Sequence, residues 1–193
     1  SGAGVVYLTV AVNELTGLLA AICIVSYLLL YTPMKRLTPL CTLMGAIPGA
    51  IPPMIGWAAA RQALGPEAWV LFSMLFLWQL PHFLAIAALY RDDYAHAGFK
   101  VLPLTEPDGL AAARQTVLYG LVLLPVSLAP TVIGLAGEWY FFGALALGVA
   151  FLAVCVRAAV RRSTQACRQL FRFSVLYLPL LLALLVLDKR AGW

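Results

Sequence analysis

Apolar runs of about 15 to 25 residues recur along the whole chain and constrain its fold more than any other feature. A helix rises about 1.5 Å per residue, so runs of this length match the roughly 30 Å hydrocarbon core of a bilayer. Of the 193 residues, 63% are hydrophobic and only 11% are charged, whereas soluble domains carry about 25% charged residues. The sequence therefore predicts an all-α, polytopic transmembrane helical bundle.

Six full spans and one partial span follow from the positions of these runs. The first run, 1–12, is only about half the length of a span. The chain starts with Ser1, and nothing near it resembles the charged region of a signal peptide. We therefore expect the sequence to begin inside a helix of a single transmembrane domain, 1–193, whose upstream helices are missing. The full spans are predicted at 14–31, 44–60, 67–90, 111–135, 139–157 and 171–187.

The connections between spans carry an uneven distribution of positive charge. Because each full span crosses once, the connections 32–43, 91–110 and 158–170 should share one face. Ten basic residues belong to this face and three to the other, and such a bias marks the cytoplasmic side. Topology thus explains the net charge of +5 without any nucleic acid. The ten are Lys35, Arg36, Arg91, Lys100, Arg114, Arg157, Arg161, Arg162, Arg168 and Arg172; the three are Arg61, Lys189 and Arg190.

The second full span has an unusual composition, with Pro48, Pro52 and Pro53 in its interior. Each interior proline removes a backbone hydrogen bond and bends the helix. Gly45 and Gly49 form a GxxxG spacing, which usually reflects close helix packing. A kinked helix that opens onto a cavity and a closely packed helix both fit this composition.

Two clusters of charge follow apolar runs on the predicted cytoplasmic face, YTPMKR at 31–36 and YRDDYAHAGFK at 90–100. Burying Arg91, Asp92 and Asp93 at mid-bilayer would cost roughly 3 kcal/mol each, so they must lie at the interface or line a wet cavity. Adjacent carboxylates suit a cation such as Mg²⁺, and basic groups suit the phosphates that it bridges. The pattern favours a metal-bridged diphosphate site, with an ordinary solvated loop end as the alternative. The basic groups are Lys35, Arg36, Arg91 and Lys100.

A polar stripe leads from the second cluster toward the middle of the membrane. On a helical wheel, Gln79, His82, Tyr90 and Asp93 fall within roughly an 80° arc. An unpaired His within a span is unfavourable, so His82 is a candidate for a functional role. The alternative for His82 is a hydrogen bond to a neighbouring helix that serves packing alone.

Three stretches of the chain resemble one family. They are VNELTGLLA, YTPMKRLTPLCTLMGAIPGAIPPMIGWAAA and LWQLPHFLAIAALYRDDYAHAGFKVLP. These stretches are similar to the protoheme IX farnesyltransferase (heme O synthase) family, within the UbiA-type intramembrane prenyltransferase superfamily. WQLPHF and YRDDY with AGFKVLP are specific to the heme branch, whereas the KR pair is shared more widely. The resemblance extends to Pro103.

The resemblance implies a nine-helix bundle around a cavity that is open to the cytoplasm and to lipid. Members of the family transfer a farnesyl group from farnesyl diphosphate to the vinyl group of heme B, giving heme O for heme A biosynthesis. Mg²⁺ is the implied cofactor, and the bacterial inner membrane is the implied location. The superfamily's first aspartate-rich motif would precede Ser1, so we expect this piece alone to be inactive. The implied partners are farnesyl diphosphate, heme B, the lipid bilayer, and either heme A synthase or terminal oxidase assembly proteins.

The superfamily's second aspartate-rich loop corresponds to residues 90–100. Quinone-type members carry DxxxD there, whereas this chain has Tyr90 and Tyr94 at the outer positions. The resemblance implies that Asp92 or Asp93 holds the metal and that aromatic faces shelter a farnesyl cation. The expected catalytic residues are Asp92, Asp93, His82, Tyr90 and Tyr94; the expected diphosphate ligands are Lys35, Arg36, Arg91 and Lys100; Asn13, Trp78 and Gln79 are weaker candidates for the heme or prenyl cavity.

Three alternatives stay open at this point. The first is another prenyltransferase of the superfamily with a quinone-type acceptor, against which the tyrosines of the second loop argue. The second is a transporter, which would concentrate polar groups near the bilayer midplane, whereas the charge here gathers at one face. The third is a paralogue without catalytic activity that lacks the first aspartate-rich motif.

Overall fold

The computed structural model describes residues 2–105 and 108–189, and in them the chain is built from helices. Within these residues six helices are long and apolar enough to cross a membrane, which confirms the predicted number of spans. The first span joins α2 (Glu14–Val25), the π-helix η1 (Ser26–Tyr31) and α3 (Thr32–Met34). The others are α4 (Cys41–Arg61), α5 (Pro66–Leu89), α8 (Leu110–Val132), α9 (Glu138–Arg161) and α10 (Thr164–Leu187), and the short helices are α1 (Gly2–Ala11), α6 (Arg91–His96) and α7 (Leu102–Thr105).

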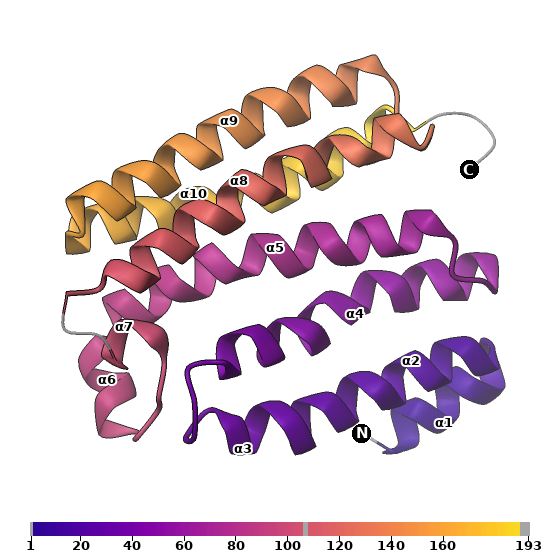
Figure 1. Cartoon of the computed structure of the whole chain (residues 1–193). Coiled ribbons are helices and arrows are strands. Elements are labelled where there is room, and N and C mark those ends of the chain that lie inside the picture. The colour runs from indigo at the N-terminus through magenta and orange to yellow at the C-terminus, as the bar shows by residue number, and fades with distance from the viewer. Residues whose placement is uncertain (1, 106–107, 190–193) are drawn as a thin grey trace.

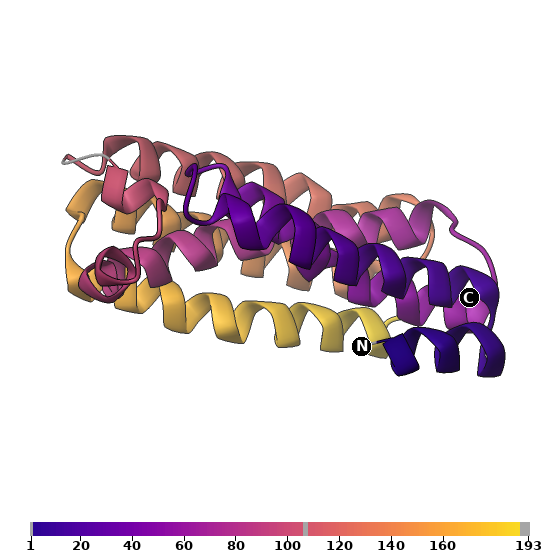
Figure 2. The same cartoon turned by 90° about the horizontal axis from the view of Figure 1, so that it is seen from below.

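The long helices lie side by side and alternate in direction, as Figures 1 and 2 show. α5 is central to this arrangement, because it contacts α4 on one side and α8 and α10 on the other. The short helix α1 begins part-way along the bundle and packs against α2 (Figure 1). It is the apolar partial span predicted at the start of the chain.

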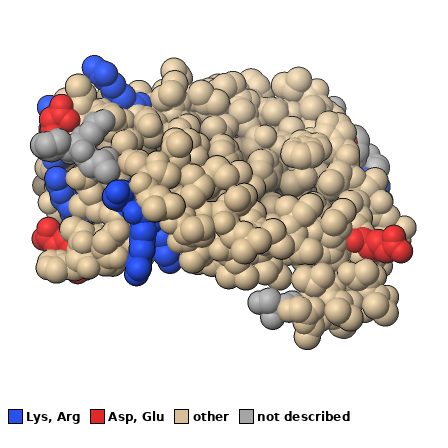
Figure 3. All heavy atoms as spheres, turned by 60° about the horizontal axis from the view of Figure 1, so that its bottom comes forward, with Lys and Arg blue, Asp and Glu red and all other residues tan. Residues whose placement is uncertain are grey.

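Three connections gather at one end of the bundle, which we call the charged end. They are the segments 35–40, 90–105 with 108–109, and 162–163, all at the left of Figure 1. Lys and Arg side chains cluster at this end in Figure 3, and the middle of the face shown is free of them. The prediction that these connections share one face is therefore confirmed.

The connection predicted at 158–170 is wrong. α9 continues to Arg161 and α10 begins at Thr164, so only Arg162 and Ser163 join them. The Ser163 hydroxyl accepts a hydrogen bond from the Ala166 N–H at 3.3 Å and caps α10. Arginines in this stretch lie on exposed helix ends, where long side chains extend toward water while their backbone stays helical. A high density of charge was therefore not a sign of a loop.

The largest apolar core lies among α5, α8, α9 and α10. Tyr140, Phe151 and Tyr177 are fully buried there, and the rings of Phe151 and Tyr177 lie 4.8 Å apart. The Tyr140 hydroxyl donates to the Ser127 carbonyl at 2.7 Å, so this buried polar group is satisfied. These four helices form a closely packed half of the bundle.

The proline-rich helix α4 stays helical from Cys41 to Arg61 despite three interior prolines. Pro52 has no N–H, so the Pro48 carbonyl one turn earlier lacks its usual donor. The Cys23 thiol on α2 lies 3.3 Å from that carbonyl and donates to it. A neighbouring helix thus satisfies part of the backbone that the prolines leave open, as a bilayer requires.

The contact between α1 and α2 depends on a glycine. A Cβ placed on Gly17 would overlap the Thr9 hydroxyl and lie 2.8 Å from Thr9 Cβ. We therefore expect Gly17→Ala to lower the thermal unfolding midpoint in detergent by several degrees, although alanine favours a helix by about 1 kcal/mol over glycine. Gly56→Ala is the control, because a Cβ there meets nothing within 4 Å. An unchanged or raised midpoint for Gly17→Ala would disprove this close packing.

Candidate functional site

A cavity of about 620 Å³ opens among α2–α3, α4, α5 and the segment that follows α5. On the first of these elements, Cys23, Tyr27, Tyr31 and Lys35 line it at intervals of four residues. In a regular α-helix such a stripe would drift about 40° per step. The π-helix η1 widens the turn at Ser26–Tyr31 and lessens this drift. An irregular helix thus keeps two aromatic rings and one cation on the same wall.

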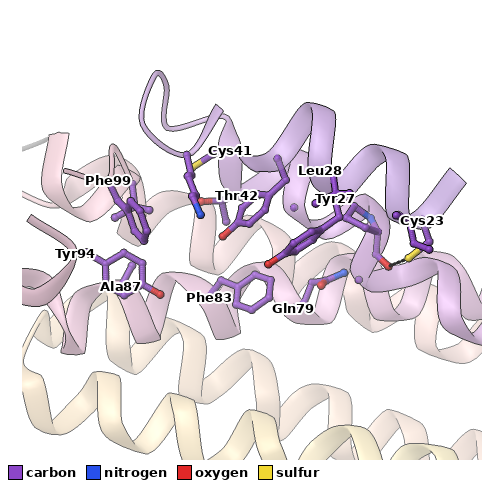
Figure 4. Close-up of a pocket in the computed structure, with 17 residues that line it drawn as sticks. Cys23, Tyr27, Leu28, Cys41, Thr42, Gln79, Phe83, Ala87, Tyr94 and Phe99 are labelled. Carbon is purple, nitrogen blue, oxygen red and sulfur yellow. Dashed lines mark hydrogen bonds between the residues drawn. The ribbon is translucent and has the colours of Figure 1, made fainter. Parts of the chain in front are cut away.

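The opposite walls come from α4 and α5. Gly45, Pro48 and Gly49 lie on the cavity side of α4, so the kinked helix does open onto a cavity. Gly45 also makes room for Tyr31, since a Cβ there would lie 2.7 Å from its ring. On α5 the cavity is lined by Gln79, Phe83 and Ala87, again four residues apart (Figure 4).

At the charged end the two clusters predicted from the sequence meet. The Lys100 N–H donates to the Lys35 carbonyl at 2.9 Å. The Lys35 ammonium group lies 5.2 Å from the centre of the Phe99 ring and 6.0 Å from that of Tyr31, within reach of cation–π attraction. Lys35, Tyr94 and Phe99 all line the cavity. One cation among aromatic rings therefore marks its mouth.

Tyr94 is the member of the YRDDY stretch that reaches the cavity (Figure 4). Its ring packs edge-on against Phe99, with the ring centres 5.5 Å apart. Burial raises the pKa of the Tyr94 hydroxyl, and a weaker contribution in the same direction comes from Cys41. The hydroxyl therefore stays protonated at physiological pH and can donate a hydrogen bond.

The predicted metal residues Asp92 and Asp93 lie in the first turn of α6, and both are exposed. They share the charged end with the cavity but do not line it. Within residues 2–105 and 108–189 no group of three or more His, Cys, Asp or Glu side chains is placed to hold a metal. The two carboxylates therefore provide at most part of a coordination sphere.

The predicted diphosphate ligands are divided between two places. Lys35 lines the cavity, and Arg36 and Lys100 are exposed beside it on the same connections. Arg91 instead lines a second cavity of about 250 Å³, together with Asp108 and Arg162. Tyr90 is exposed where α5 ends and lines neither of these cavities. The structure thus brings one predicted cation directly to the main cavity and two more close to it.

Two residues of the polar stripe predicted on α5 face different neighbouring helices. Gln79 faces α4 and the cavity, where its side-chain N–H donates to the Ala46 carbonyl at 2.8 Å. His82 faces α10, with its Nδ1 atom 2.8 Å from the Ser174 hydroxyl. Its ring stacks on Trp78 and Phe171, with ring centres 5.0 and 5.2 Å away. The wheel placed Gln79 and His82 on one arc, but the structure does not bring them to one site.

The two remaining candidates have structural contacts. The Trp78 indole N–H donates to the Ser174 carbonyl at 2.8 Å, so Trp78 joins α5 to α10. Asn13 caps α2 by accepting from the Thr16 N–H at 2.8 Å, and its amide donates to the Ala58 carbonyl at 3.0 Å. It lies at the end of α2 opposite Lys35. Neither residue lines the main cavity.

Several cavity residues were not singled out from the sequence as site residues. Tyr27 and Tyr31 lie in the first full apolar run, and Phe83 lies in the third. Aromatic residues in a membrane span are common, so their identity alone carried no signal. The available clue was the four-residue spacing from Cys23 to Lys35, because residues at this spacing lie on one side of a helix, and here that side ends at Lys35 at the charged end.

The placement of His82 leads to a prediction about stability. We expect His82→Ala to lower the thermal midpoint in detergent, because it removes three ring contacts and one hydrogen bond to the Ser174 hydroxyl. His96→Ala is the matched control, since His96 is exposed on α6. An unchanged midpoint for His82→Ala, accompanied by a loss of activity in the full-length protein, would instead support contact with heme or with the reacting water.

The chain belongs to the UbiA prenyltransferase family, which matches residues 1–178. The names of its similar relatives describe a more specific activity than the family name does. It is 51% identical over 187 residues to a protoheme IX farnesyltransferase of Solibacter usitatus, with 97% of this chain and 64% of the relative covered. It is 48% identical over 195 residues to one of Koribacter versatilis, with 97% and 62% covered. The chain thus spans slightly less than two thirds of these relatives.

The fold is also found in a solved structure, described as that of a digeranylgeranylglyceryl phosphate synthase in membranes. The TM-score is 0.77, and the match covers 96% of this chain and 64% of the other. The sequences are 15% identical, so this likeness concerns the fold alone. It confirms the predicted membrane prenyltransferase architecture.

Proposed function

We propose that the full-length protein transfers a farnesyl group from farnesyl diphosphate to a vinyl group of heme B, producing heme O and diphosphate. The main support is a cavity that joins Lys35 at the charged end to an apolar interior, since farnesyl diphosphate has a charged head and an apolar tail. Heme B is proposed as the acceptor because relatives named protoheme IX farnesyltransferase match 97% of the chain.

Lys35 would bind the diphosphate head at the mouth of the cavity, with Arg36 and Lys100 close by. When the bond between the farnesyl C1 carbon and oxygen breaks, both electrons stay on the diphosphate. Fixed cations stabilise this growing negative charge, and they act most strongly where water is excluded. Lys35 is half-buried, so it combines charge with partial exclusion of water.

Prenyltransferases of this family generally use a divalent metal to bind the diphosphate. Asp92 and Asp93 would contribute oxygen ligands to it, and the metal would add positive charge at the leaving group. Mg²⁺ takes about six oxygen ligands, so the remainder must come from the diphosphate, water or other carboxylates. The exposure of both side chains at the charged end suits this partial role.

The farnesyl cation would form beside the rings of Tyr31, Tyr94 and Phe99, whose faces attract positive charge. The vinyl group of heme B then supplies its π electrons to the C1 carbon, and a new carbon–carbon bond forms. The positive charge moves to the carbon next to the porphyrin, where water adds and releases a proton to solvent. A neutral Tyr94 hydroxyl can orient this water or the departing phosphate oxygen.

The depth of the cavity suits the tail. Ala87 and Gln79 on α5 lie eight residues apart, which corresponds to about 12 Å along the helix. A farnesyl chain has about eleven consecutive carbon–carbon bonds and extends about 13 Å at about 1.2 Å per bond. Burial of this chain would stabilise the complex by about 0.8 kcal/mol per CH₂ group.

The charged end would face the cytoplasm, since positive residues favour that side. The relatives are bacterial, which supports an inner-membrane location. Heme A synthase, which would use heme O, is the first protein partner to test.

Lys35→Ala in the full-length protein tests the diphosphate site. We expect the KM for farnesyl diphosphate to rise at least about tenfold while the KM for heme B changes little, because the proposed role of this charge is to bind the diphosphate. Steady-state formation of heme O measures both constants. Arg168→Ala is the control, as Arg168 is exposed at the same end outside the cavity. Equal changes in both constants would remove Lys35 from this role.

The orientation can be tested with cysteine labelling in a background without native cysteines. Ala97 is exposed at the charged end, and Ala63 is exposed on the connection between α4 and α5 at the other end. In intact cells we expect a membrane-impermeant maleimide to label Ala63→Cys and not Ala97→Cys, and permeabilisation to expose both. The reverse pattern would place the charged end outside.

A further inference from the structure

The main cavity ends at one level on three helices. Its lining residues farthest from the charged end are Cys23 on α2, Gly49 on α4 and Gln79 on α5. Among the residues that the structure describes, none deeper on these three helices lines it. A chain that enters at Lys35 therefore meets a floor at this level.

Gln79 lies across this floor from α5 to α4. Its side chain is only 4% exposed, and its Nε2 atom donates to the Ala46 carbonyl at 2.8 Å. A Cβ placed on Gly49 would overlap the Gln79 side-chain oxygen, so the amide rests directly on the α4 backbone. Figure 4 shows Gln79 and Cys23 at the end of the cavity away from Tyr94 and Phe99. A side chain at position 49 would therefore displace the Gln79 amide from this position.

A packed apolar cluster continues beyond the floor. Leu19, Ile51 and Met54 are buried in it, and Cys23 packs against it from the cavity side. A longer tail would have to displace both the Gln79 bridge and these close-packed side chains, and protein cores resist added volume. Packed side chains therefore close the deep end of the cavity.

The floor lies at a depth that separates prenyl chains by length. Cys41 and Gly49 on α4 are eight residues apart, as are Ala87 and Gln79 on α5, and each interval corresponds to about 12 Å. At about 1.2 Å per bond, a geranyl chain extends about 8 Å, a farnesyl chain about 13 Å and a geranylgeranyl chain about 18 Å. Measured along α4 and α5, the first chain leaves the cavity partly empty, the second fills it, and the third exceeds it. The longer interval on α2–α3, from Cys23 to Lys35, would also hold the diphosphate head.

We propose that Gln79, seated against Gly49, is the residue that sets the prenyl chain length of this enzyme. The inference rests on the proposed function for the identity of the tail, since it assumes that the main cavity holds a prenyl diphosphate. Gln79 would thus determine which chain length binds. It would take no part in breaking the carbon–oxygen bond, which would occur at the mouth near Lys35.

The test uses the full-length protein in detergent with Mg²⁺ and unreactive thiolodiphosphate analogues of geranyl, farnesyl and geranylgeranyl diphosphate. Dissociation constants are measured for each analogue. The wild type should bind the farnesyl analogue more tightly than the other two. Gln79→Ala removes the bridge and leaves the packed cluster beyond it in place, so it should lower the dissociation constant of the geranylgeranyl analogue, relative to the farnesyl analogue, by about threefold or more. Gln79→Leu keeps a side chain of similar size and should retain the farnesyl preference.

Gly49→Ala provides the opposite change. Its Cβ would displace the Gln79 amide and add a methyl group to the cavity wall at the floor, which should shift the preference toward the geranyl analogue. Gly56→Ala on the same helix is the matched control and should leave all three constants unchanged, because its Cβ meets nothing within 4 Å. Thermal midpoints measured alongside show that each variant is folded.

Two results would overturn the inference: a wild type that binds the geranylgeranyl analogue as tightly as the farnesyl analogue, or a folded Gln79→Ala variant with the wild-type ratio. A parallel assay with reactive farnesyl diphosphate and heme B separates this outcome from failure of the proposed function. If no heme O forms but the binding ratios shift as expected, the acceptor is wrong and the role of Gln79 stands.

Discussion

The backbone hydrogen bond from Lys100 to Lys35 joins two connections that lie far apart in the sequence, and the candidate site depends on it. A membrane allows charge at its surfaces and requires apolar groups between them. A protein that handles an amphipathic substrate must therefore place a cation where an apolar cavity meets the interface. The 2.9 Å contact does this by holding Lys35 beside Phe99 at the mouth. Without this hydrogen bond, the segment of Phe99 and Lys100 would no longer be tied to the Lys35 backbone.

The two halves of the bundle differ in a way that suits this role. α8, α9 and α10 pack around buried aromatic rings with α5. In the other half, α4 carries three interior prolines and the first span contains a π-helix. Irregular helices do not interdigitate as closely as regular ones, and space remains between them where η1 and α4 face each other. Residues of η1 and the glycines Gly45 and Gly49 of α4 line this space, and α5 forms another wall. Prolines alone do not account for it, since α5, α8 and α10 also carry interior prolines.

Much of the fold could be predicted because its cause is local. The length of each apolar run determines whether it spans a bilayer, and the alternation of spans determines which connections share an end. The connection at 158–170 failed because arginines on exposed helix ends look like a loop in the sequence. A helical wheel placed Gln79 and His82 about 60° apart, yet it contains no information about which neighbour each residue faces. That depends on where α4 and α10 pack, which is a property of the whole bundle.

Less of the candidate site than of the fold could be predicted, since three of the expected site residues, Lys35, Gln79 and Tyr94, line the main cavity and the others do not. Lys35 and Tyr94 belong to the two charged clusters, which were both assigned to one face because charge must lie near the interface. Tyr27 and Phe83 were hidden within apolar runs, where an aromatic ring that packs and one that lines a cavity look alike. The family resemblance, which rested on WQLPHF and YRDDY, is confirmed by the match to the UbiA prenyltransferase family.

The choice of acceptor is the most direct test of the central claim. The full-length protein, purified and supplied with farnesyl diphosphate and Mg²⁺, can be given heme B or 4-hydroxybenzoate in parallel reactions. Mass spectrometry of the products should show heme B increased by one farnesyl group and one hydroxyl group, and 4-hydroxybenzoate unchanged. Farnesylated 4-hydroxybenzoate with unmodified heme B would contradict the account and point to a quinone-type prenyltransferase.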